Sequence, residues 1–267
     1  MTTHTYAGTA LITGASSGIG AIYADRLARR GHDLILVARN RSRLETLARR
    51  ITDQTGRSVE IVTADLGQAA ELRHVENILR TDASITTLVN NAGFGGASPL
   101  LASDADTMQA MIELNVTALT RLTYAAAPAF VARRQGTIIN IASIVAIAPE
   151  VLNGVYGGSK AFVLAFTQSL QHELAGHGVR VQAVLPGATR TAFWDIAGHP
   201  VENLSETLVM DGDDLVDAAL AGLDQGEVIT LPSLPDAADW QAFEAARAVL
   251  GPNLSHAQPA ARYGIAR

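Results

Sequence analysis

The sequence predicts one α/β domain over residues 1–267, with a doubly wound parallel sheet of about seven strands and helices on both of its faces. Short runs rich in Val, Ile and Leu alternate with longer amphipathic segments along most of the chain. The runs show little polar alternation, which is typical of strands that are buried on both faces. Short connections join runs and segments, and no linker is long or polar enough to divide the chain.

Seven apolar runs are expected to form the strands. In chain order they are Thr9–Thr13, Asp33–Ala38, Val59–Thr63, Thr87–Asn90, Thr137–Ala142, Val179–Leu185 and Glu227–Thr230. Most of the intervals between them have helical spacing, so a helix joins successive strands and the strands run parallel. These helices are expected at Gly18–Arg30, Arg41–Thr55, Ala69–Arg80, Asp104–Arg134, Val155–His177 and Asp211–Leu223.

Two regions break this alternation. Residues 187–210 show no clear period, and their apolar members include Phe193, Trp194 and Ile196. Irregular segments at the carboxyl ends of parallel strands usually border the binding crevice, so we expect a substrate loop or lid here, with a plain surface loop as the alternative. Residues 232–267 are expected to form a helical tail, with one helix over residues 236–250 that a Gly-Pro pair stops.

Composition excludes several classes of function. The net charge is −6, whereas binding to nucleic acid without sequence preference needs a clustered basic surface. The chain contains no cysteine, which excludes disulfides, thiolate metal sites and a cysteine nucleophile. The sequence contains no recognisable signal segment and no apolar stretch of about 18 residues. We therefore expect a soluble, cytoplasmic protein with no nucleic-acid partner and no membrane partner.

A glycine-rich turn, Thr13-Gly14-Ala15-Ser16-Ser17-Gly18-Ile19-Gly20, follows the first strand. Glycine allows the chain to turn sharply and lets a pyrophosphate approach the backbone without meeting a Cβ atom. The helix that begins near Gly18 presents unpaired N–H groups and the positive end of its dipole to the phosphates. The turn therefore predicts a dinucleotide site, whose contacts are expected from Gly14, Ser16, Ser17, Gly18, Ile19 and Gly20.

The same residues also match G-x-S-x-G, the nucleophile elbow of serine hydrolases, with Ser16 as the nucleophile. A hydrolase would need a downstream acid and then a histidine, each at a strand end. Of the late histidines, His199 alone lies in a plausible loop. A serine hydrolase is therefore the alternative function from a different reaction class.

Tyr156 and Lys160 stand four residues apart at the start of the helix after the fifth strand, so they share one helical face. A free tyrosine has a pKa of about 10, which is too high for ready proton exchange at neutral pH. Lowering it by about three units requires roughly 4 kcal/mol, which a cation about 4 Å away supplies at an effective dielectric of about 20. The pair therefore predicts a tyrosine acid–base group with Lys160 lowering its pKa.

Further polar residues follow the strands on either side. Ser143 follows the fifth strand, and the fourth strand ends in Asn90-Asn91-Ala92-Gly93. Asn115 stands inside an otherwise apolar helix, where a buried amide needs a hydrogen-bond partner. These residues are the remaining candidates for a site at the carboxyl edge of the sheet.

Together these elements resemble the short-chain dehydrogenase/reductase family. The family's TGxxxGxG, NNAG, Asn, Ser, YxxxK and PGxxxT elements all occur, in order and at family-like spacing, between about Thr9 and Thr191. The resemblance implies a Rossmann-like fold and hydride transfer between nicotinamide and a small-molecule carbonyl or alcohol. It also implies a homodimer or homotetramer, with the 104–134 and 155–177 helices at the subunit contact.

The resemblance assigns a role to each matching residue. Ser143 would hydrogen-bond the substrate oxygen, and Tyr156 would donate or accept its proton. Lys160 would hold the nicotinamide ribose and lower the pKa of Tyr156, while Asn115 would hold the helix shape and a water that links Lys160 to solvent. The remaining cofactor contacts would come from Asn91, Ala92 and Gly93 along the cofactor, Asp65 and Leu66 at adenine, and Thr191 at the carboxamide.

The end of the second strand indicates which nucleotide is preferred. An enzyme that selects NAD usually places a carboxylate there for the ribose 2′-hydroxyl. This chain has Ala38 followed by Arg39, whose guanidinium suits a 2′-phosphate. Ser17 departs from the pattern, because NADP-preferring relatives often have a second basic residue at that position. We therefore expect a preference for NADP(H), with NAD(H) also possible.

Two further interpretations were weighed. His172 and His177 resemble a zinc-binding H-E-x-x-H motif, but the extra residue between them turns the second ring off the first one's face, so no metal site is expected. A non-catalytic dinucleotide-sensing protein would share the fold, yet a sensor has no need of an activated phenol. The set Ser143, Tyr156 and Lys160 therefore favours an enzyme.

Overall fold

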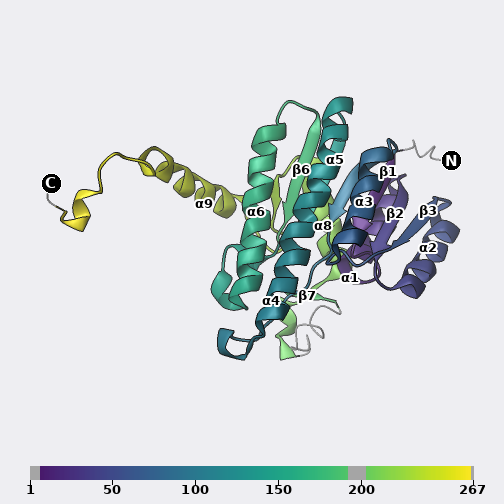
Figure 1. The fold of residues 1–267 in the computed structure, drawn as a ribbon, viewed down its shortest axis with the longest axis horizontal. Coiled ribbons are helices and arrows are strands. Elements are labelled where there is room, and N and C mark those ends of the chain that lie inside the picture. Colours follow the sequence, from purple (N-terminus) through teal and green to yellow (C-terminus); the bar gives the residue numbers. More distant parts are fainter. Residues whose placement is uncertain (1–6, 192–202, 266–267) are drawn as a thin grey trace. The chain divides into compact units, whose positions relative to one another are not determined.

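Seven parallel strands form the main sheet of the computed structural model, in the order β3-β2-β1-β4-β5-β6-β9 (Figure 1). The structure describes residues 7–191 and 203–265. Because the strand order reverses direction between β1 and β4, the switch point, where doubly wound folds bind ligands, lies at the carboxyl ends of these two strands. The strands are β1 (Thr9–Thr13), β2 (Asp33–Ala38), β3 (Val59–Thr63), β4 (Ile85–Asn90), β5 (Gly136–Ile141), β6 (Val179–Val184) and β9 (Ile229–Thr230).

Helices connect the strands and cover both faces of the sheet. One core cluster joins the sheet to α1, α2 and α8, and the other joins the opposite face to α3, α5 and α6. This two-sided burial explains the unbroken apolar runs in the strands. The helices are α1 (Gly18–Arg29), α2 (Arg41–Thr55), α3 (Ala69–Thr81), α4 (Ala105–Ile112), α5 (Leu119–Arg133), α6 (Gly154–Leu174), α8 (Gly212–Gln225) and α9 (Ala237–Leu250).

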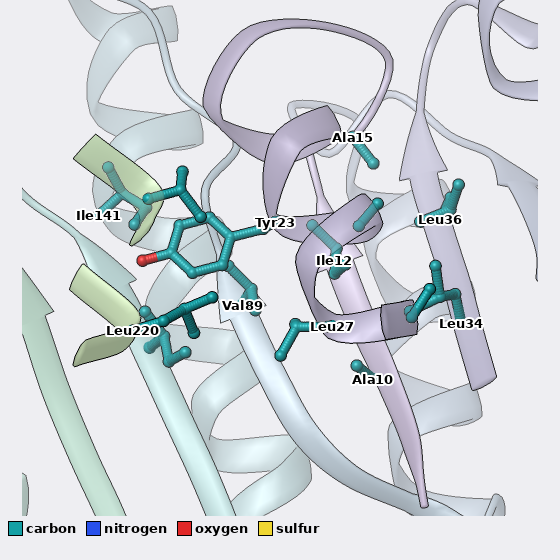
Figure 2. Close-up of a cluster of buried hydrophobic side chains, with 14 of the residues drawn as sticks. Ala10, Ile12, Ala15, Tyr23, Leu27, Leu34, Leu36, Val89, Ile141 and Leu220 are labelled. Atoms are coloured by element: carbon teal, nitrogen blue, oxygen red, sulfur yellow. The ribbon is translucent and has the colours of Figure 1, made fainter. Parts of the chain in front are cut away.

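The core under α1 is aliphatic apart from one large ring. Tyr23 is fully buried and points from α1 into side chains of β4, β5 and α8 such as Val89, Ile141 and Leu220 (Figure 2). Its hydroxyl has no hydrogen-bond partner among the described residues. Burial accordingly raises the pKa of Tyr23. The first helix is therefore anchored by apolar packing alone at this position.

The predicted fold class is confirmed, and most strand and helix bounds agree with the sequence analysis within two residues. The helix expected at Val155–His177 is the largest exception at a helix end, since α6 ends at Leu174. Gly176 and Gly178 follow with φ values of +80° and +74°. These left-handed conformations are incompatible with a continuing helix.

The helix expected at Asp104–Arg134 is interrupted. It consists of α4, the π-helical turn η2 (Glu113–Ala118) and α5. The expectation of one continuous helix was therefore wrong at this point. An extra residue in a π turn does not disturb the apolar spacing enough to be visible in a sequence, and such turns are frequent at functional sites. Asn115 lies inside this turn.

The chain divides into two units, Met1–Pro232 and Ser233–Arg267. The first unit contains the whole sheet together with a small parallel pair, β7 (Thr189–Arg190) and β8 (Met210–Asp211). The second unit contains α9, in which no residue is buried and Trp240 stacks on Phe243 with ring centroids 5.2 Å apart. None of the helices that the structure describes has the length and apolar character to cross a membrane.

Candidate active site

The glycine turn after β1 has no room for side chains at two of its positions. A Cβ atom on Gly20 would lie 2.5 Å from Nδ2 of Asn91 and 2.6 Å from the carbonyl oxygen of Gly14. One on Gly14, where φ is +65°, would lie 2.9 Å from Cα of Ala92. Glycine is therefore required here by close backbone approach, as expected for a turn that presents its backbone to a phosphate.

Hydrogen bonds fix this turn to the end of β4. The hydroxyl of Thr13 accepts from the backbone N–H groups of Asn91 and Ala92, each at 3.0 Å. In return, Nδ2 of Asn91 donates to the carbonyl oxygens of Thr13 at 2.8 Å and Gly14 at 3.2 Å. The segment Asn91-Ala92-Gly93 therefore runs beside the turn, as the sequence analysis expected of residues that share one site.

The start of α1 fits a dinucleotide phosphate. Ser17 is the N-cap residue with extended backbone and makes no side-chain hydrogen bond to the helix. The first N–H groups of α1 thus lack a side-chain acceptor, which is the arrangement that binds anions at helix N-termini. A Cβ atom on Gly18, where φ is +54°, would be 3.4 Å from the side chain of Thr191, so Thr191 also lies at this turn.

Ser16 lies in the same turn, but none of the residues that the structure describes forms a hydrolase triad with it. Among the described residues, no histidine and no carboxylate makes a hydrogen bond with its hydroxyl. His199, the histidine that the alternative required, lies outside the described residues, as do Phe193, Trp194 and Ile196. The described geometry therefore gives the hydrolase interpretation no support.

The residues expected at the adenine end of the site follow β2 and β3. Arg39 directly follows β2, is exposed, and forms no hydrogen bond or ion pair with another described side chain. Asp65 follows β3, and one of its carboxylate oxygens accepts from the N–H of Gly67 at 3.0 Å. Leu66 beside it is buried. A guanidinium without a protein partner at the end of β2 is free to meet a phosphate.

Ser143 and Tyr156 meet at the carboxyl end of β5. Ser143 lies two residues beyond the strand and caps the short turn that follows it. Tyr156 lies in the first turn of α6, is 6% exposed, and shares a side-chain hydrogen bond with Ser143. The two hydroxyls thus converge on one point, as expected if both are to contact the same substrate oxygen.

Lys160 lies one turn along α6, but it acts differently from what the sequence suggested. Its Nζ atom donates to the carbonyl oxygen of Ile141 at 2.8 Å and is 5.8 Å from the centre of the Tyr156 ring. Burial raises the pKa of Tyr156 to about 12, and the hydrogen bond with Ser143 offsets only part of this effect. Burial also lowers the pKa of Lys160 to about 8.

The expected lowering of the Tyr156 pKa by Lys160 is therefore wrong for the structure described here. Both groups are taken out of water, so the charged form of each is disfavoured. A cation one helical turn away favours the phenolate, but the desolvation of both groups outweighs that attraction. Burial therefore makes the phenol of Tyr156 a weaker acid than a free tyrosine.

The side chain of Asn115 connects the π turn by hydrogen bonds to the segment after β4 and to α6. Its Oδ1 accepts from the N–H of Phe94 at 3.1 Å, and its Nδ2 donates to the carbonyl oxygen of Phe94 at 2.9 Å. Nδ2 also donates to the hydroxyl of Ser159 at 3.1 Å, which in turn donates to the carbonyl oxygen of Tyr156 at 2.8 Å. Gly93 packs so closely that a Cβ atom would lie 2.8 Å from Oδ1 of Asn115 and 3.6 Å from Nζ of Lys160.

Two sets of buried polar residues were missed by the sequence analysis. Asn153 caps α6 three residues before Tyr156, and an asparagine just before a helical segment was the signal that could have revealed it. A chain of side-chain hydrogen bonds also links α5 to α6 by way of β4 and β5, and no sequence pattern predicted which of its members pair. Its members are Thr123, Asn90, Asn140 and Thr167, with Asn90 and Asn140 joined at 2.9 Å.

Tyr156 belongs to a small apolar cluster separate from the two main cores. Its buried members are Tyr156, Met111 and Val145, and Phe94, Met108, Leu152 and Val155 pack against them. These residues come from the segment after β4, from α4, from the turn after β5 and from the start of α6. The described surroundings of the phenol are therefore apolar, with Ser143 and Lys160 as the polar exceptions.

A nucleotide-binding turn beside a Ser–Tyr–Lys group defines a nucleotide-dependent oxidoreductase, and comparison with known proteins gives the family. A family model for short chain dehydrogenase matches residues 8–199. The solved short-chain dehydrogenase from Sphingobium yanoikuyae in complex with NADPH is 51% identical with a TM-score of 0.92, covering 95% of this chain and 98% of that one. This chain belongs to the short-chain dehydrogenase family.

Two further relatives agree with this assignment. The bulky-bulky ketone specific alcohol dehydrogenase from Comamonas testosteroni is 45% identical with a TM-score of 0.90, covering 97% of this chain and 99% of that one. Human 17-beta-hydroxysteroid dehydrogenase type 3 is 37% identical over 188 residues, which are 69% of this chain and 60% of the human protein. The chain is thus an NAD(P)-dependent oxidoreductase that acts on ketone or alcohol substrates, which confirms the expected function.

Proposed function

We propose that this chain is an NADPH-preferring reductase of bulky apolar ketones, with Tyr156 as the proton donor. The observation that carries the proposal is the hydrogen-bonded pair Ser143 and Tyr156, with Lys160 one turn away, at the same sheet edge as a tight glycine turn whose helix has no side-chain cap. A sensor protein would have no use for this pair of hydroxyls. A serine hydrolase with Ser16 as its nucleophile would have no use for a Ser143–Tyr156 pair.

The residues present fit a dinucleotide. Gly14 and Gly20 pack too closely against Asn91 and Ala92 for any Cβ atom, which keeps the turn tight, and the first N–H groups of α1 have no side-chain acceptor and can meet the pyrophosphate. The other contacts are proposed from Ser16, Ser17, Gly18, Ile19, Asp65, Leu66, Asn91, Ala92, Gly93 and Thr191. When bound, the nicotinamide supplies the hydride that the protein's own side chains cannot provide.

The chain's own residues orient the carbonyl group and deliver the proton. Ser143 donates a hydrogen bond to the carbonyl oxygen, and the phenol of Tyr156 transfers its proton to the same oxygen. The phenol is protonated at neutral pH and therefore carries the proton that reduction consumes, although burial raises its pKa and makes it a weaker acid than a free tyrosine. Lys160 and Asn115 hold this arrangement: Asn115 is joined through Ser159 to the backbone of Tyr156.

The preference for NADPH is proposed from Arg39. Its exposed guanidinium has no described side-chain partner, and no carboxylate stands at the end of β2 to meet a ribose 2′-hydroxyl. A guanidinium binds a phosphate through two parallel hydrogen bonds. The relative from Sphingobium yanoikuyae was solved with NADPH, which supports the same preference.

A bulky apolar substrate is proposed from the cluster around Tyr156. Apolar side chains from four elements surround the phenol, so a ketone with apolar groups on both sides would gain by leaving water there. The name of the Comamonas testosteroni relative, specific for ketones with two bulky groups, supports the same class. Segment 187–210 is proposed as the substrate loop, and its ends are joined where β7 pairs with β8.

We further propose that the enzyme is a cytoplasmic homodimer or homotetramer. Support comes from an aromatic row on α5 and α6, in which the half-buried Phe166 stacks with the exposed Tyr124 and Phe162, with ring centroids 6.3 and 5.5 Å away. Sedimentation velocity on the wild type and on Phe162→Glu tests this. A monomeric wild type would contradict it.

Ketone reduction followed at the NADPH absorbance band tests the function. Tyr156→Phe is expected to lower kcat by on the order of 10³-fold, because it removes the proton donor, and to leave the Kd for NADPH within about twofold. Ser16→Ala, by contrast, abolishes activity only in a hydrolase. Unchanged turnover in Tyr156→Phe would contradict the proposed mechanism.

Arg39→Ala tests the nucleotide preference separately. We expect the KM for NADPH to rise by about tenfold or more, because a charge-assisted pair with the 2′-phosphate is lost. The KM for NADH should change by less than about twofold, since NADH has no phosphate there. Equal effects on both nucleotides would refute the preference while leaving the reductase function intact.

A further inference from the structure

One buried amide outside the Ser–Tyr–Lys group joins two parts of the site. Asn153 lies at the N-terminus of α6, three residues before Tyr156, and is 6% exposed. Its side-chain Oδ1 accepts from the N–H of Val155 at 2.8 Å and of Tyr156 at 3.4 Å. One half of the amide therefore holds the first turn of the helix that carries the phenol.

The other half of the amide faces a different segment. We define residues Gly93–Ser103, between β4 and α4, as the wall segment. Nδ2 of Asn153 donates to the carbonyl oxygen of Ser98 at 2.8 Å and to the hydroxyl of Ser103 at 3.1 Å. The backbone N–H of Asn153 also donates to the carbonyl oxygen of Gly96 at 3.2 Å. Three hydrogen bonds from one residue thus hold the wall segment to α6.

The wall segment borders the phenol. Phe94 packs against the cluster of Tyr156, Met111 and Val145, and a Cβ atom on Gly96 would lie 3.5 Å from Cε of Met111. Asn115 binds both backbone groups of Phe94, so the segment is held at its start by Asn115 and farther along by Asn153. The rest of the wall segment has little secondary structure, since Leu100–Ala102 is its one helical turn.

We propose that Asn153 is a positioning residue that fixes the distance between the wall segment and the phenol of Tyr156, and thereby sets how bulky a ketone the site accepts. This inference rests on the proposed ketone reduction. The physical reason is that one planar amide makes both sets of contacts, so α6 and the wall segment cannot move apart without breaking partly buried hydrogen bonds and leaving the buried amide of Asn153 without partners. A buried polar group that loses its hydrogen-bond partners costs more than one at the surface.

Two variants separate the capping half of the amide from the tethering half. Asn153→Asp keeps an acceptor for the helix N–H groups and replaces both Nδ2 donor bonds with a carboxylate that faces the carbonyl oxygen of Ser98. Asn153→Ser also keeps a capping oxygen but is too short to reach Ser98. Ser103→Ala weakens the same tether from the other side.

Asn40→Ser is the matched control. Asn40 caps α2 by accepting from the N–H of Arg43 at 3.1 Å, and its side chain does not contact the wall segment. Asn40→Ser therefore reports the effect of the same substitution at a helix cap alone. The ratio of bulky to small ketone kcat/KM should be the same in this control as in the wild type.

The experiment measures kcat and KM for ketones of increasing size at saturating NADPH, and hydrogen exchange of the free proteins. For the three tether variants we expect the KM for bulky ketones to rise about tenfold, with kcat changed less than about threefold and small ketones little affected. Amides of residues 94–103 should exchange faster while those of α6 keep their protection. A merely structural role would lower activity equally for all ketones.

Two outcomes would overturn the inference without touching the proposed function. In the first outcome the wild type reduces ketones, and all three tether variants show the same dependence of KM on ketone size as the wild type. The other is unchanged exchange over residues 94–103. A wild type that reduced no ketone would overturn the proposed function, and this inference with it, and exchange would then show whether the tether exists at all.

Discussion

The glycine turn and the Ser–Tyr–Lys group lie at the same edge of the sheet, but they are held together in different ways. The turn is fixed by backbone shape, since Gly14 and Gly20 approach Asn91 and Ala92 too closely for any side chain. The group around Tyr156 is instead fixed by buried side-chain amides, chiefly Asn115 and Asn153. The shape of the turn therefore requires residues without a Cβ atom, whereas the shape of the group around Tyr156 requires side chains that donate and accept hydrogen bonds.

This difference teaches which substitutions each region tolerates. Replacing a glycine of the turn by alanine should strongly destabilise the fold. The same substitution in α6, the helix that carries Tyr156, should be tolerated where no atom lies near the new Cβ atom. Removing a charge from the second region should even stabilise the fold, because Lys160 is buried. The four predictions that follow test these statements.

Gly20→Ala should have the largest effect. Its Cβ atom would lie 2.5 Å from Nδ2 of Asn91 and 2.6 Å from the carbonyl oxygen of Gly14, so the turn must shift. We expect a loss of about 3 kcal/mol in the free energy of unfolding, measured in urea, and more than about tenfold weaker NADPH binding. Gly154→Ala, where nothing lies within 4 Å, is the control and should lower neither quantity.

Lys160→Met should abolish ketone reduction and yet raise the free energy of unfolding at neutral pH. Burial lowers the pKa of Lys160 from its usual 10.5 to about 8, so the folded state disfavours the ammonium. After allowance for the lost hydrogen bond to Ile141, we expect a gain of about 2 kcal/mol.

The sign of its pH dependence follows from the same values. Below pH 8 the lysine is protonated in both the folded and the unfolded states, and the cost of burying the ammonium is fully present. Between about pH 8 and pH 10.5 the folded state releases the proton first, so the cost disappears. The stability advantage of the variant, measured by urea unfolding, should therefore shrink as the pH rises from 8 towards 10.5 and then reverse, because the variant still lacks the hydrogen bond to Ile141. A difference that stays constant with pH would argue against a buried ammonium.

Tyr23→Phe should be mildly stabilising. The hydroxyl is buried without a described hydrogen-bond partner, while the ring fills the core beneath the turn (Figure 2). Removing the hydroxyl and keeping the ring should raise the free energy of unfolding by about 1 kcal/mol. Tyr124→Phe at an exposed position is the control. Destabilisation by Tyr23→Phe would mean that the hydroxyl has a partner, such as an internal water.

Gly158→Ala should have the smallest effect and shows that a glycine near Tyr156 is not required. Its Cβ atom would meet nothing within 4 Å, so the variant should gain about 0.5 to 1 kcal/mol from helix propensity, with kcat unchanged. Gly157→Ala makes the same change one residue earlier, where the Cβ atom would lie 3.1 Å from Pro149. Thermal unfolding that ranked Gly157→Ala above Gly158→Ala would contradict this reading of the packing.

Sequence patterns were sufficient for the sheet and for most of the candidate site. The strand from Thr9 to Thr13 and its glycine turn were predictable because burial on both faces leaves an unbroken apolar run and tight turns require glycine. Spacing likewise identified Tyr156 and Lys160 as neighbours on one helical face. The π turn at Asn115 was not predictable, since one extra residue leaves the apolar pattern almost unchanged.

By itself the sequence determined which residues would be buried, which would turn, and which chemical groups would gather at the carboxyl edge of the sheet. All three follow from local periodicity and residue type. Only the tertiary structure decided the direction in which the pKa of Tyr156 shifts and the pairing of Asn153 with the wall segment. The reason is physical: desolvation and hydrogen-bond pairing depend on which distant segments exclude water from a group, and no local pattern records that.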